Sequence, residues 1–247
     1  MYKRYALTIR YDGTNYCGWQ YQKNGITVQQ VMIETLESII GKLKDGLHGC
    51  SRTDSGVHAD EYVCHFDSET KVPCRNIVLG LNSRLPEDIV VLDCKEVDSE
   101  FHSRYGCKSK TYRYYIYPSP FSDPFKRNYE YLYKNMIDIE LLDECSKEYI
   151  GYHDFSAFCS VGTTVEDKFR TIYDCKVFES GDGRAVFEVT GDGFLYNMVR
   201  IMVGTLIYAN EGKITKDDIK NMLCGGSRDI TGPTAAALGL HLHKVNY

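Results

Sequence analysis

The sequence predicts an α+β fold built from two halves that repeat one order of elements. The first half reads as βαββαβ, and the second half loosely follows the same order. Units of this kind usually pack as ferredoxin-like halves, each with an antiparallel sheet and its helices on one side. We therefore expect residues 1–107 and 108–247 to form two such halves.

The first strand and the first helix carry the clearest patterns. Residues 4–11 alternate apolar and polar side chains as a half-buried strand does, and Asp12-Gly13 ends the strand with turn residues. Thr27, with Gln30 three residues later, has the pattern of a capping box at a helix N-terminus. The next residues at helical spacing, which predict one amphipathic helix, are Val28, Val31, Thr35, Leu36, Ile39 and Leu43.

The other elements follow from shorter patterns. In the first half we expect strands at 47–50, 61–67 and 89–97 and a helix at 75–85. In the second half we expect strands at 110–117, 170–179, 184–190 and 238–243, and helices at 140–150, 194–210 and 216–223. The proline-containing stretch 118–124 is expected to be a long surface loop.

Composition indicates a chain with an adequate core. It has 247 residues, 43% of them apolar, and no stretch approaches the roughly 20 uninterrupted apolar residues of a membrane span. The first residues, MYKRY, lack the apolar run of a signal peptide. We therefore expect a soluble, cytoplasmic protein.

The ten cysteines are scattered, without a CxxC pair or a clustered spacing with histidine. We expect free thiols in a reducing compartment and no metal site. Cys64 beside His65 could suggest a thiol nucleophile, but the pair lies inside an alternating apolar run, where buried structural cysteine is commoner.

The formal net charge of −5 argues against a protein that binds nucleic acid over its whole surface. Any RNA site must therefore be local. Twenty tyrosines interleaved with Arg and Lys are compatible with stacking on bases, although most of them will be half-buried sheet residues.

The segment 48–59, HGCSRTDSGVHA, joins two expected strands and is rich in small residues. Taken alone, its Thr-Asp-Ser-Gly stretch is ordinary turn chemistry. The segment nevertheless resembles the GRTDxGVHA signature of the tRNA pseudouridine synthase A (TruA) family. Further blocks resemble that family in the family's order: KTYRY at 110–114, HDFSAF at 153–158, GFLYNMVR at 193–200, GPT at 232–234 and GL at 239–240. Chance is a poor explanation for matches that cover essentially the whole chain.

The resemblance implies an isomerase that converts uridine to pseudouridine at positions 38–40 in the anticodon stem-loop of tRNA, with no cofactor and no metal. It assigns the catalytic carboxylate to Asp54, which must be ionised whether it attacks the sugar or stabilises a sugar-centred intermediate. It also implies that Arg200 is the cation that keeps Asp54 ionised, and that Tyr112 stacks on the base or takes a proton. The resemblance further implies that the two halves form one continuous antiparallel sheet with helices on one side, and that the cleft between the halves is the catalytic cleft.

Two of these assignments have structural alternatives. Tyr112 shares its expected strand with Tyr114, Tyr115 and Tyr117, most of which must be packing residues, so only the motif match selects it. Arg200 could be an ordinary surface arginine, but its neighbours are so apolar that a charge there is expected to have a partner.

Five further residues are expected to bind the substrate: Arg52, Leu195, Lys110, Arg113 and Phe155. By resemblance, Arg52 enters the stack that the flipped uridine vacates, and a phosphate contact is the alternative. Leu195 is expected to pack against the flipped base unless it is a plain core leucine. Lys110 and Arg113 could contact phosphates, although a solvated charged surface explains them equally well. Phe155 is selected only by its motif.

Three positions depart from the family pattern: Ser51, Ser55 and Ala236. If the backbone of Ser51 must adopt a positive φ, serine would cost about 1 kcal/mol or more there. Family members work as homodimers whose tRNA site uses both subunits, so a homodimer with tRNA as its partner is expected. Two alternatives stay open: a pseudouridine synthase acting on ribosomal RNA, and a catalytically silent tRNA-binding protein.

Overall fold

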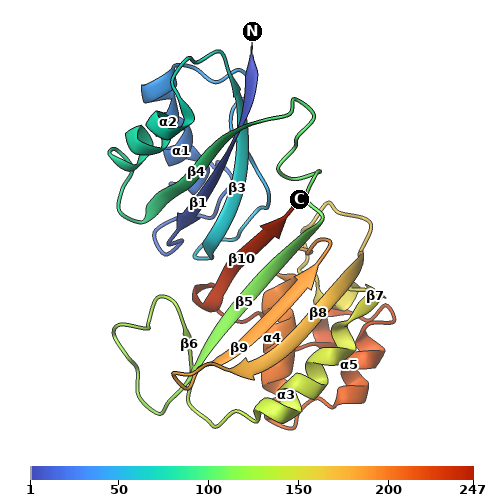
Figure 1. Ribbon diagram of the computed structural model, residues 1–247. Coiled ribbons are helices and arrows are strands. Elements are labelled where there is room, and N and C mark those ends of the chain that lie inside the picture. Colours follow the sequence, from blue (N-terminus) through green and yellow to red (C-terminus); the bar gives the residue numbers. More distant parts are fainter. Residues whose placement is uncertain (1) are drawn as a thin grey trace. The chain divides into compact units, whose positions relative to one another are not determined.

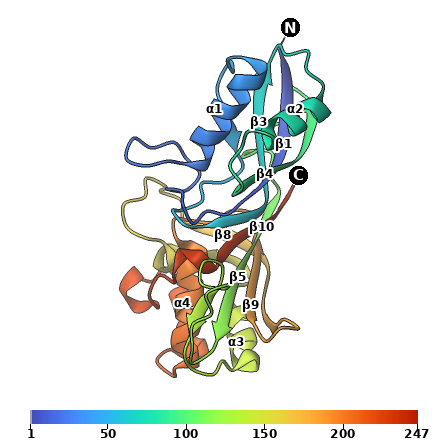
Figure 2. The same ribbon diagram turned by 90° about the vertical axis from the view of Figure 1, so that its left-hand side faces the viewer.

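The computed structural model describes residues 2–247 and has the expected α+β fold. The chain divides into two compact units, whose helices and strands are labelled in Figures 1 and 2. The first unit contains the chain up to Lys108 together with His241–Tyr247, and the second contains Ser109–Leu240. The last strand therefore groups with the first unit, where it pairs with another strand. The expected division into halves at residues 107 and 108 stays a prediction.

The first unit combines a small sheet with two helices. Its elements are β1 (Lys3–Tyr11), α1 (Val28–Ile40), β2 (His48–Gly49), β3 (His58–Ser68), α2 (Cys74–Asn82), β4 (Ile89–Val97) and β10 (Leu240–Asn246). The strands follow the order β4-β1-β3-β10, and β2 pairs with β3. β1 is antiparallel to both of its neighbours, whereas β10 runs parallel to β3.

Alternation along β1 creates the core of this unit. Its odd-numbered residues Tyr5, Leu7, Ile9 and Tyr11 are buried, as the period of a half-buried strand requires. The two helices pack against each other on one face of the sheet (Figures 1 and 2). Each fully buried aliphatic side chain contributes about 1.5–3 kcal/mol relative to an exposed one.

The second unit combines strands of the ten-stranded sheet with three helices in the described chain. Its elements are β5 (Ser109–Pro118), β6 (Tyr131–Tyr133), α3 (Ile139–Ser146), β7 (Gly151–Asp154), β8 (Phe169–Glu179), β9 (Ala185–Gly191), α4 (Met198–Asn210) and α5 (Lys216–Met222). The strands follow the order β5-β9-β8-β7 with antiparallel pairing, and β6 pairs in parallel with β5.

Helix α4 is the most buried helix of the second unit. Only three of its thirteen residues are not buried, and α3 packs against it. A Cβ atom at Gly204 would lie 1.7 Å from the carbonyl oxygen of Pro233, so no other residue allows this approach of helix and backbone. The hydroxyl of Thr205 also accepts a hydrogen bond from the amide of Gly232 at 3.0 Å. The segment 232–235 is thereby fixed against α4.

Most expected elements are present, with shifted ends. The helix expected at 194–210 begins only at Met198, because Asn197 has left-handed backbone angles that a helix does not allow. The helix expected at 140–150 ends at Ser146 and continues as one turn of 3₁₀-helix. Strands β6 and β7 were not predicted, since three or four residues are too few to show a period.

Only one of the two hydrogen bonds of the expected capping box at α1 is present. The Thr27 hydroxyl accepts a hydrogen bond from the Gln30 amide at 3.3 Å, as expected. The Gln30 side chain, however, donates to Glu34 at 3.0 Å instead of reaching back to the Thr27 backbone. A partner one turn ahead on the helix surface competes successfully for that amide.

Two further expectations concern membranes and thiols. Across residues 2–247, no helix is long and apolar enough to cross a membrane. All ten cysteines are free thiols. Cys64 is fully buried, and burial raises its pKa well above the ordinary value, which is the property of a structural cysteine and not of a nucleophile.

Candidate active site

Asp54 and Arg52 lie in the loop between β2 and β3 of the first unit, Asp54 half-buried and Arg52 exposed. The main chain is hydrogen-bonded on both sides of Asp54. The Trp19 amide donates to the carbonyl oxygen of Thr53 at 3.2 Å, and the Val57 amide donates to the carbonyl oxygen of Asp54 at 3.2 Å. These bonds fix the backbone that carries the candidate carboxylate.

Gly18 supports this loop from the turn that precedes α1. Its φ is +81°, and a Cβ atom there would lie 2.4 Å from the carbonyl oxygen of Thr53. Any other residue would be strained by the backbone angle and blocked by the contact. Beneath the loop, the buried rings of Trp19 and Tyr62 stack with centroids 4.2 Å apart. The hydroxyls of Tyr11 and Thr53 are 2.8 Å apart.

The two serines of this loop fit without strain. Within residues 2–247, Asn197 is the one non-glycine residue with a positive φ, so the strain considered for Ser51 does not occur. The Tyr62 hydroxyl donates to the carbonyl oxygen of Ser51 and lies 3.4 Å from its amide nitrogen. The Ser55 hydroxyl donates to the carbonyl oxygen of Tyr16 at 3.1 Å. Both departures from the family pattern are therefore accommodated.

Tyr112 lies on β5 of the second unit and is only 6% exposed. Its ring meets the ring of Phe194 edge-on, with centroids 5.1 Å apart. Tyr114, two residues further on the same strand, is a packing residue, because its buried hydroxyl donates to the carbonyl oxygen of Ala236 at 2.8 Å. Burial raises the pKa of Tyr114 above its usual value. Ala236, the third departure, thus contributes only its backbone here.

Arg113 and Lys110 lie on the same strand and differ in their surroundings. The Arg113 guanidinium contacts the Glu188 carboxylate at 2.6 Å, and Lys176 contacts the same carboxylate at 2.8 Å. Burial alone would raise the pKa of Glu188, but the two cations outweigh it and hold that pKa below the ordinary value. Lys110 is half-buried opposite Gly191 of β9. A phosphate contact by either residue stays a prediction.

Arg200 projects from the first turn of α4 and is half-buried. Its Nε donates to the carbonyl oxygen of Ala235 at 2.7 Å, and its Nη1 donates to the side-chain oxygen of Asn197 at 2.9 Å. The Ala235 amide in turn donates to the carbonyl oxygen of Arg200 at 3.1 Å. The guanidinium is thus oriented by groups of the second unit, and its expected pairing with Asp54 stays a prediction.

Asn197 is a positioning residue that the sequence analysis missed. It caps α4 with φ 59° and ψ 9°, a left-handed conformation that asparagine tolerates better than most residues. Its amide nitrogen donates to the hydroxyl of Ser160 at 2.9 Å while its amide oxygen accepts from Arg200. Asn197 falls inside the helix expected at 194–210, and the tolerance of asparagine for left-handed backbone angles was the available signal for a later start.

Leu195 and Phe155 are the two apolar residues expected to bind the substrate. Leu195 is 7% exposed and lies in the turn before α4, where its amide approaches the sulfur of Met198 at 3.4 Å. Phe155 is fully buried and packs against Phe158 with ring centroids 5.9 Å apart. Packing alone accounts for Phe155, and contact of either side chain with a base stays a prediction.

The predicted site residues are divided between the two units. Arg52 and Asp54 belong to the first unit, and the second unit carries the remaining six: Lys110, Tyr112, Arg113, Phe155, Leu195 and Arg200. In the described part of the chain, no three His, Cys, Asp or Glu side chains are grouped so that they could hold a metal ion. The chemistry available to these residues is that of a carboxylate, a guanidinium and a phenol.

Comparison with known proteins agrees with the motifs. The model of the tRNA pseudouridine synthase family matches residues 7–106 and 145–247. A tRNA pseudouridine synthase A of Clostridium acetobutylicum is 47% identical over 99% of this chain and 100% of its own length. The chain belongs to the tRNA pseudouridine synthase family. Proteins of the same name from Ruminiclostridium cellulolyticum and a Thermoanaerobacter species are 42% and 43% identical over 99% and 98% of this chain, and over 100% and 98% of their own lengths.

The two kinds of similarity support the site residues unequally. The stretches matched by the tRNA pseudouridine synthase model include the loop of Asp54 and the helix of Arg200. Residues 107–144, which include Tyr112, lie outside those stretches but inside the nearly full-length similarity to the synthases. The role of Tyr112 therefore rests on its local motif more than that of Asp54 does.

Proposed function

We propose that this protein isomerises uridine to pseudouridine in tRNA, at positions 38–40 of the anticodon stem-loop. The observation that carries the proposal is similarity at 41–47% identity, over nearly the whole chain, to proteins named tRNA pseudouridine synthase A. The loop that holds Asp54 lies inside the part matched by the family model. The α+β fold alone would not support this function, because many different activities share it.

The reaction needs a carboxylate but no redox partner. The N1–C1′ bond of the uridine breaks, the base turns while it stays bound, and C5 bonds to C1′. The hydrogen on C5 is lost as a proton and N1 gains one, so atoms and electrons balance within the nucleoside and its solvent. Asp54, ionised, either attacks the sugar or stabilises the charge that develops on it.

The other residues take roles around Asp54. Arg200 keeps the carboxylate ionised when the bound nucleotide excludes water, since desolvation alone would raise its pKa. Tyr112 stacks on the base or accepts the proton that C5 loses. Arg52, on the exposed part of the same loop as Asp54, occupies the stack that the flipped uridine leaves. Lys110, Arg113, Leu195 and Phe155 complete the set of substrate-binding candidates.

The architecture that we propose follows the family. The two units are ferredoxin-like halves, divided near residue 107, that share one sheet with helices on one side and form the catalytic cleft together. The protein acts in the cytoplasm as a homodimer whose tRNA site uses both subunits. The order of strands and helices along the first unit, βαββαβ, supports this proposal, because it is the order of a split βαβ unit.

The test is a comparison of wild type with Asp54→Asn on unmodified tRNA that carries uridines at positions 38–40. Pseudouridine is mapped by carbodiimide-dependent stops of reverse transcription, without any added cofactor. We expect stops at those positions with wild type and none with Asp54→Asn, whose tRNA affinity stays within a few-fold of wild type. Turnover by Asp54→Asn would show that Asp54 is not the catalytic carboxylate. Tight binding without stops by wild type would favour a catalytically silent tRNA-binding protein. Modification of ribosomal RNA alone would show that ribosomal RNA, and not tRNA, is the substrate.

A further inference from the structure

The first unit carries a cavity and an adjoining groove that lie next to the Asp54 loop. The cavity, about 290 Å³ in volume, is lined by Arg4, Asp45, His48, His65, Asp67 and His102. The groove, about 360 Å³ in volume, shares His48, His102 and Asp45 with it and is also lined by Arg52, Arg104 and Tyr105. Arg52 is two residues from Asp54, so the groove begins at the catalytic loop.

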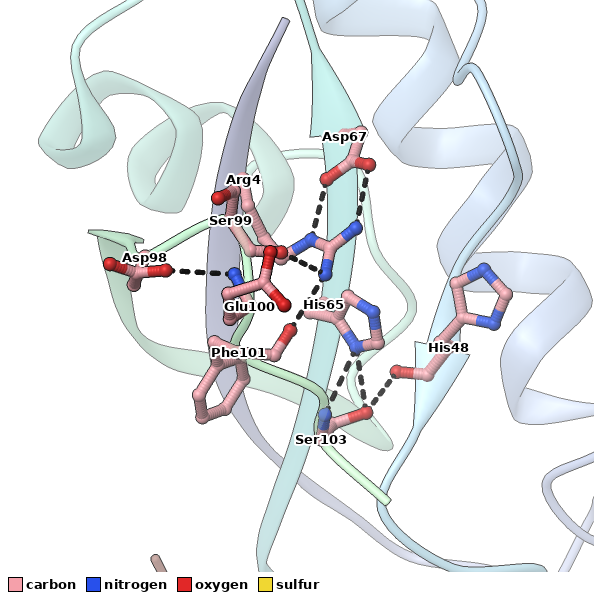
Figure 3. Close-up of polar contacts among 9 residues, drawn as sticks. All are labelled: Arg4, His48, His65, Asp67, Asp98, Ser99, Glu100, Phe101 and Ser103. Carbon is pink, nitrogen blue, oxygen red and sulfur yellow. Dashed lines mark hydrogen bonds and ion pairs between the residues drawn. The ribbon is translucent and has the colours of Figure 1, made fainter. Parts of the chain in front are cut away.

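An ion pair forms one wall of the cavity (Figure 3). Nε and Nη2 of Arg4 contact the two carboxylate oxygens of Asp67 at 2.7 and 2.8 Å. Nη1 of the same arginine donates to the carbonyl oxygens of Ser99 and Phe101 at 2.6 and 2.8 Å. The segment that follows β4 is thereby tied to β1 and β3, so the cavity has a fixed wall.

His65 forms an uncharged floor. The Ser103 amide donates to Nδ1 of His65 at 3.2 Å, and the Ser103 hydroxyl lies 2.8 Å from both that nitrogen and the carbonyl oxygen of His48 (Figure 3). Because Nδ1 accepts a hydrogen bond from an amide N–H, Nδ1 carries no proton itself. Burial, together with the neighbouring His102, His48 and Arg4, lowers the pKa of His65 to about 4, so its ring is neutral at pH 7.

His48 and His102 lie on this floor. The ring of His48 stacks on His65 with centroids 5.0 Å apart, and the ring of His102 meets His65 edge-on at 4.7 Å. Nδ1 of His102 accepts hydrogen bonds from the amides of Arg104 and Tyr105 at 3.1 and 3.2 Å. The neutral His102 ring therefore carries its proton on Nε2. With Nδ1 of both His65 and His102 occupied by amide donors, the cluster is built for anions and not for a metal ion.

Tyr105 presents an exposed aromatic ring at the edge of the groove. It is 79% exposed, yet its ring lies 4.4 Å from the His102 ring and 5.8 Å from the Arg104 guanidinium. Exposed aromatic rings beside arginines are the usual platforms on which single-stranded RNA stacks its bases. Placed at the groove, this ring is suited to a base whose phosphate lies among the cations.

The fixed charges of the lining favour an anion. Arg4 and Asp67 neutralise each other, which leaves Arg52 and Arg104 against the single carboxylate of Asp45. This local excess of positive charge contrasts with the net charge of −5 of the whole chain.

His102 adds a hydrogen-bond donor without adding a charge. Burial and the neighbouring His48, Arg4 and Arg104 lower the pKa of His102, so the free protein leaves this ring neutral at pH 7. Because its Nδ1 already accepts from two amides, the Nε2–H is the group that His102 can offer to a phosphate.

We propose that this groove binds one phosphodiester, and stacks one adjoining base on Tyr105, in the RNA strand that continues from the target uridine. The inference rests on the proposed function, because that function supplies the RNA at Arg52 and Asp54. Arg104 contacts the phosphate, and the Nε2–H of the neutral His102 ring donates a hydrogen bond to it. The subsite lies wholly within the first unit.

Affinity for a fluorescein-labelled anticodon stem-loop RNA, measured by anisotropy between about 50 and about 200 mM salt, tests the phosphate contact. Arg104→Ala should reduce the slope of log affinity against log salt by about one, the value of one phosphate contact. Arg75→Ala is the matched control, since Arg75 is an exposed arginine on α2 outside the groove lining. Asp45→Asn should strengthen binding about two- to threefold, a gain that misfolding cannot produce.

The stacking contact is tested at Tyr105. Tyr105→Ala should weaken binding at least about fivefold, the lower end of the contribution of one stacked base, whereas Tyr105→Phe should keep wild-type affinity. Because the side chain is exposed, neither substitution removes a core residue. Equal affinity for the alanine variant and the phenylalanine variant would overturn the stacking role.

The His102 hydrogen bond gives a further readout. Because the neutral ring donates its Nε2–H to the phosphate, His102→Ala should weaken RNA binding about tenfold. Calorimetry at pH 7 in two buffers of different ionisation enthalpy should show the same proton balance for wild type and His102→Ala, since Nδ1 of His102 stays bonded to two amides. His153→Ala, at a half-buried histidine of the second unit, is the control. Equal affinity for His102→Ala and wild type would overturn this hydrogen bond.

The same preparations separate the two proposals. If wild type forms pseudouridine while Arg104→Ala and Tyr105→Ala keep its KM and salt slope, the groove proposal is overturned and the proposed function stands. If wild type forms no pseudouridine but the groove variants lose affinity as described, the groove stands and the proposed function fails. Absence of RNA binding by wild type overturns the groove proposal.

Discussion

Asp54 and Arg200, the two charges proposed for catalysis, are positioned by different means. The Asp54 loop is held through its backbone, by amides on both sides and by the close approach of Gly18 to the Thr53 carbonyl. Arg200 is held at its guanidinium, by one carbonyl oxygen and by the side chain of Asn197. Damage to the first arrangement should unfold the loop, whereas damage to the second should misplace a charge in an otherwise intact fold.

The arrangement that holds Arg200 includes a small backbone strain at Asn197. The left-handed backbone of Asn197 costs about 1 kcal/mol or more relative to glycine. Each of its two side-chain hydrogen bonds contributes about 0.5–1.5 kcal/mol, which offsets that cost. The strained residue therefore persists because its side chain links Arg200 to Ser160.

The largest expected effect is that of Gly18→Ala. Strain at φ +81° and a Cβ 2.4 Å from the Thr53 carbonyl should together lower the free energy of unfolding by about 3 kcal/mol. Thermal unfolding should shift down by roughly 6–12 °C. Turnover should fall as well, because Asp54 follows Thr53 directly.

Gly41→Ala is the control for that substitution. Gly41 also has φ +81°, but nothing lies within 4 Å of the position of its Cβ. Its cost should be the backbone strain alone, about 1–2 kcal/mol. Equal losses at the two glycines would show that the contact with Thr53 does not hold the Asp54 loop.

A smaller effect on stability, but a clear one on turnover, is expected for Asn197→Gly. Glycine adopts the left-handed angles without strain, so the lost hydrogen bonds should lower the free energy of unfolding by only about 1–2 kcal/mol. Loss of the partner of Arg200 Nη1 should lower kcat about tenfold, with a smaller change in KM.

Asn197→Ala separates the two contributions of this residue. Alanine loses the same hydrogen bonds and also carries the strain of a Cβ, so it should be about 1 kcal/mol less stable than the glycine variant while showing the same kcat. A kcat equal to wild type in both variants would mean that Asn197 supports the fold and does not orient Arg200.

The sequence predicted the parts of the fold that have a long local period. Residues 89–97 form β4 as expected, and the buried alternation of β1 agrees with its pattern. The short strands β6 and β7 form by pairing with β5 and β8, and such distant partners leave no local signal.

The candidate site divides in the same way. Asp54 and Arg200 were selected by resemblance to family motifs, because turn chemistry and helix patterns alone do not single them out. The cavity lined by His48, His65 and His102 could not be predicted. The pairing of β2 with β3 brings His48 opposite His65, and the segment after β4 adds His102. Spacing along the chain does not show that three such residues meet.

The smallest expected effect is that of Ser51→Gly, and its sign is what matters. If the loop of Asp54 held Ser51 in a left-handed conformation, glycine would stabilise the protein by about 1 kcal/mol. Ser51 has no positive φ, so glycine should instead lower the free energy of unfolding by about 0.5–1 kcal/mol, through the greater freedom of the unfolded chain. Urea unfolding of the two proteins decides between these signs. A stabilised variant would show that the Asp54 loop carries strain of the kind found at Asn197, and that its backbone bonds position the carboxylate at a cost in stability.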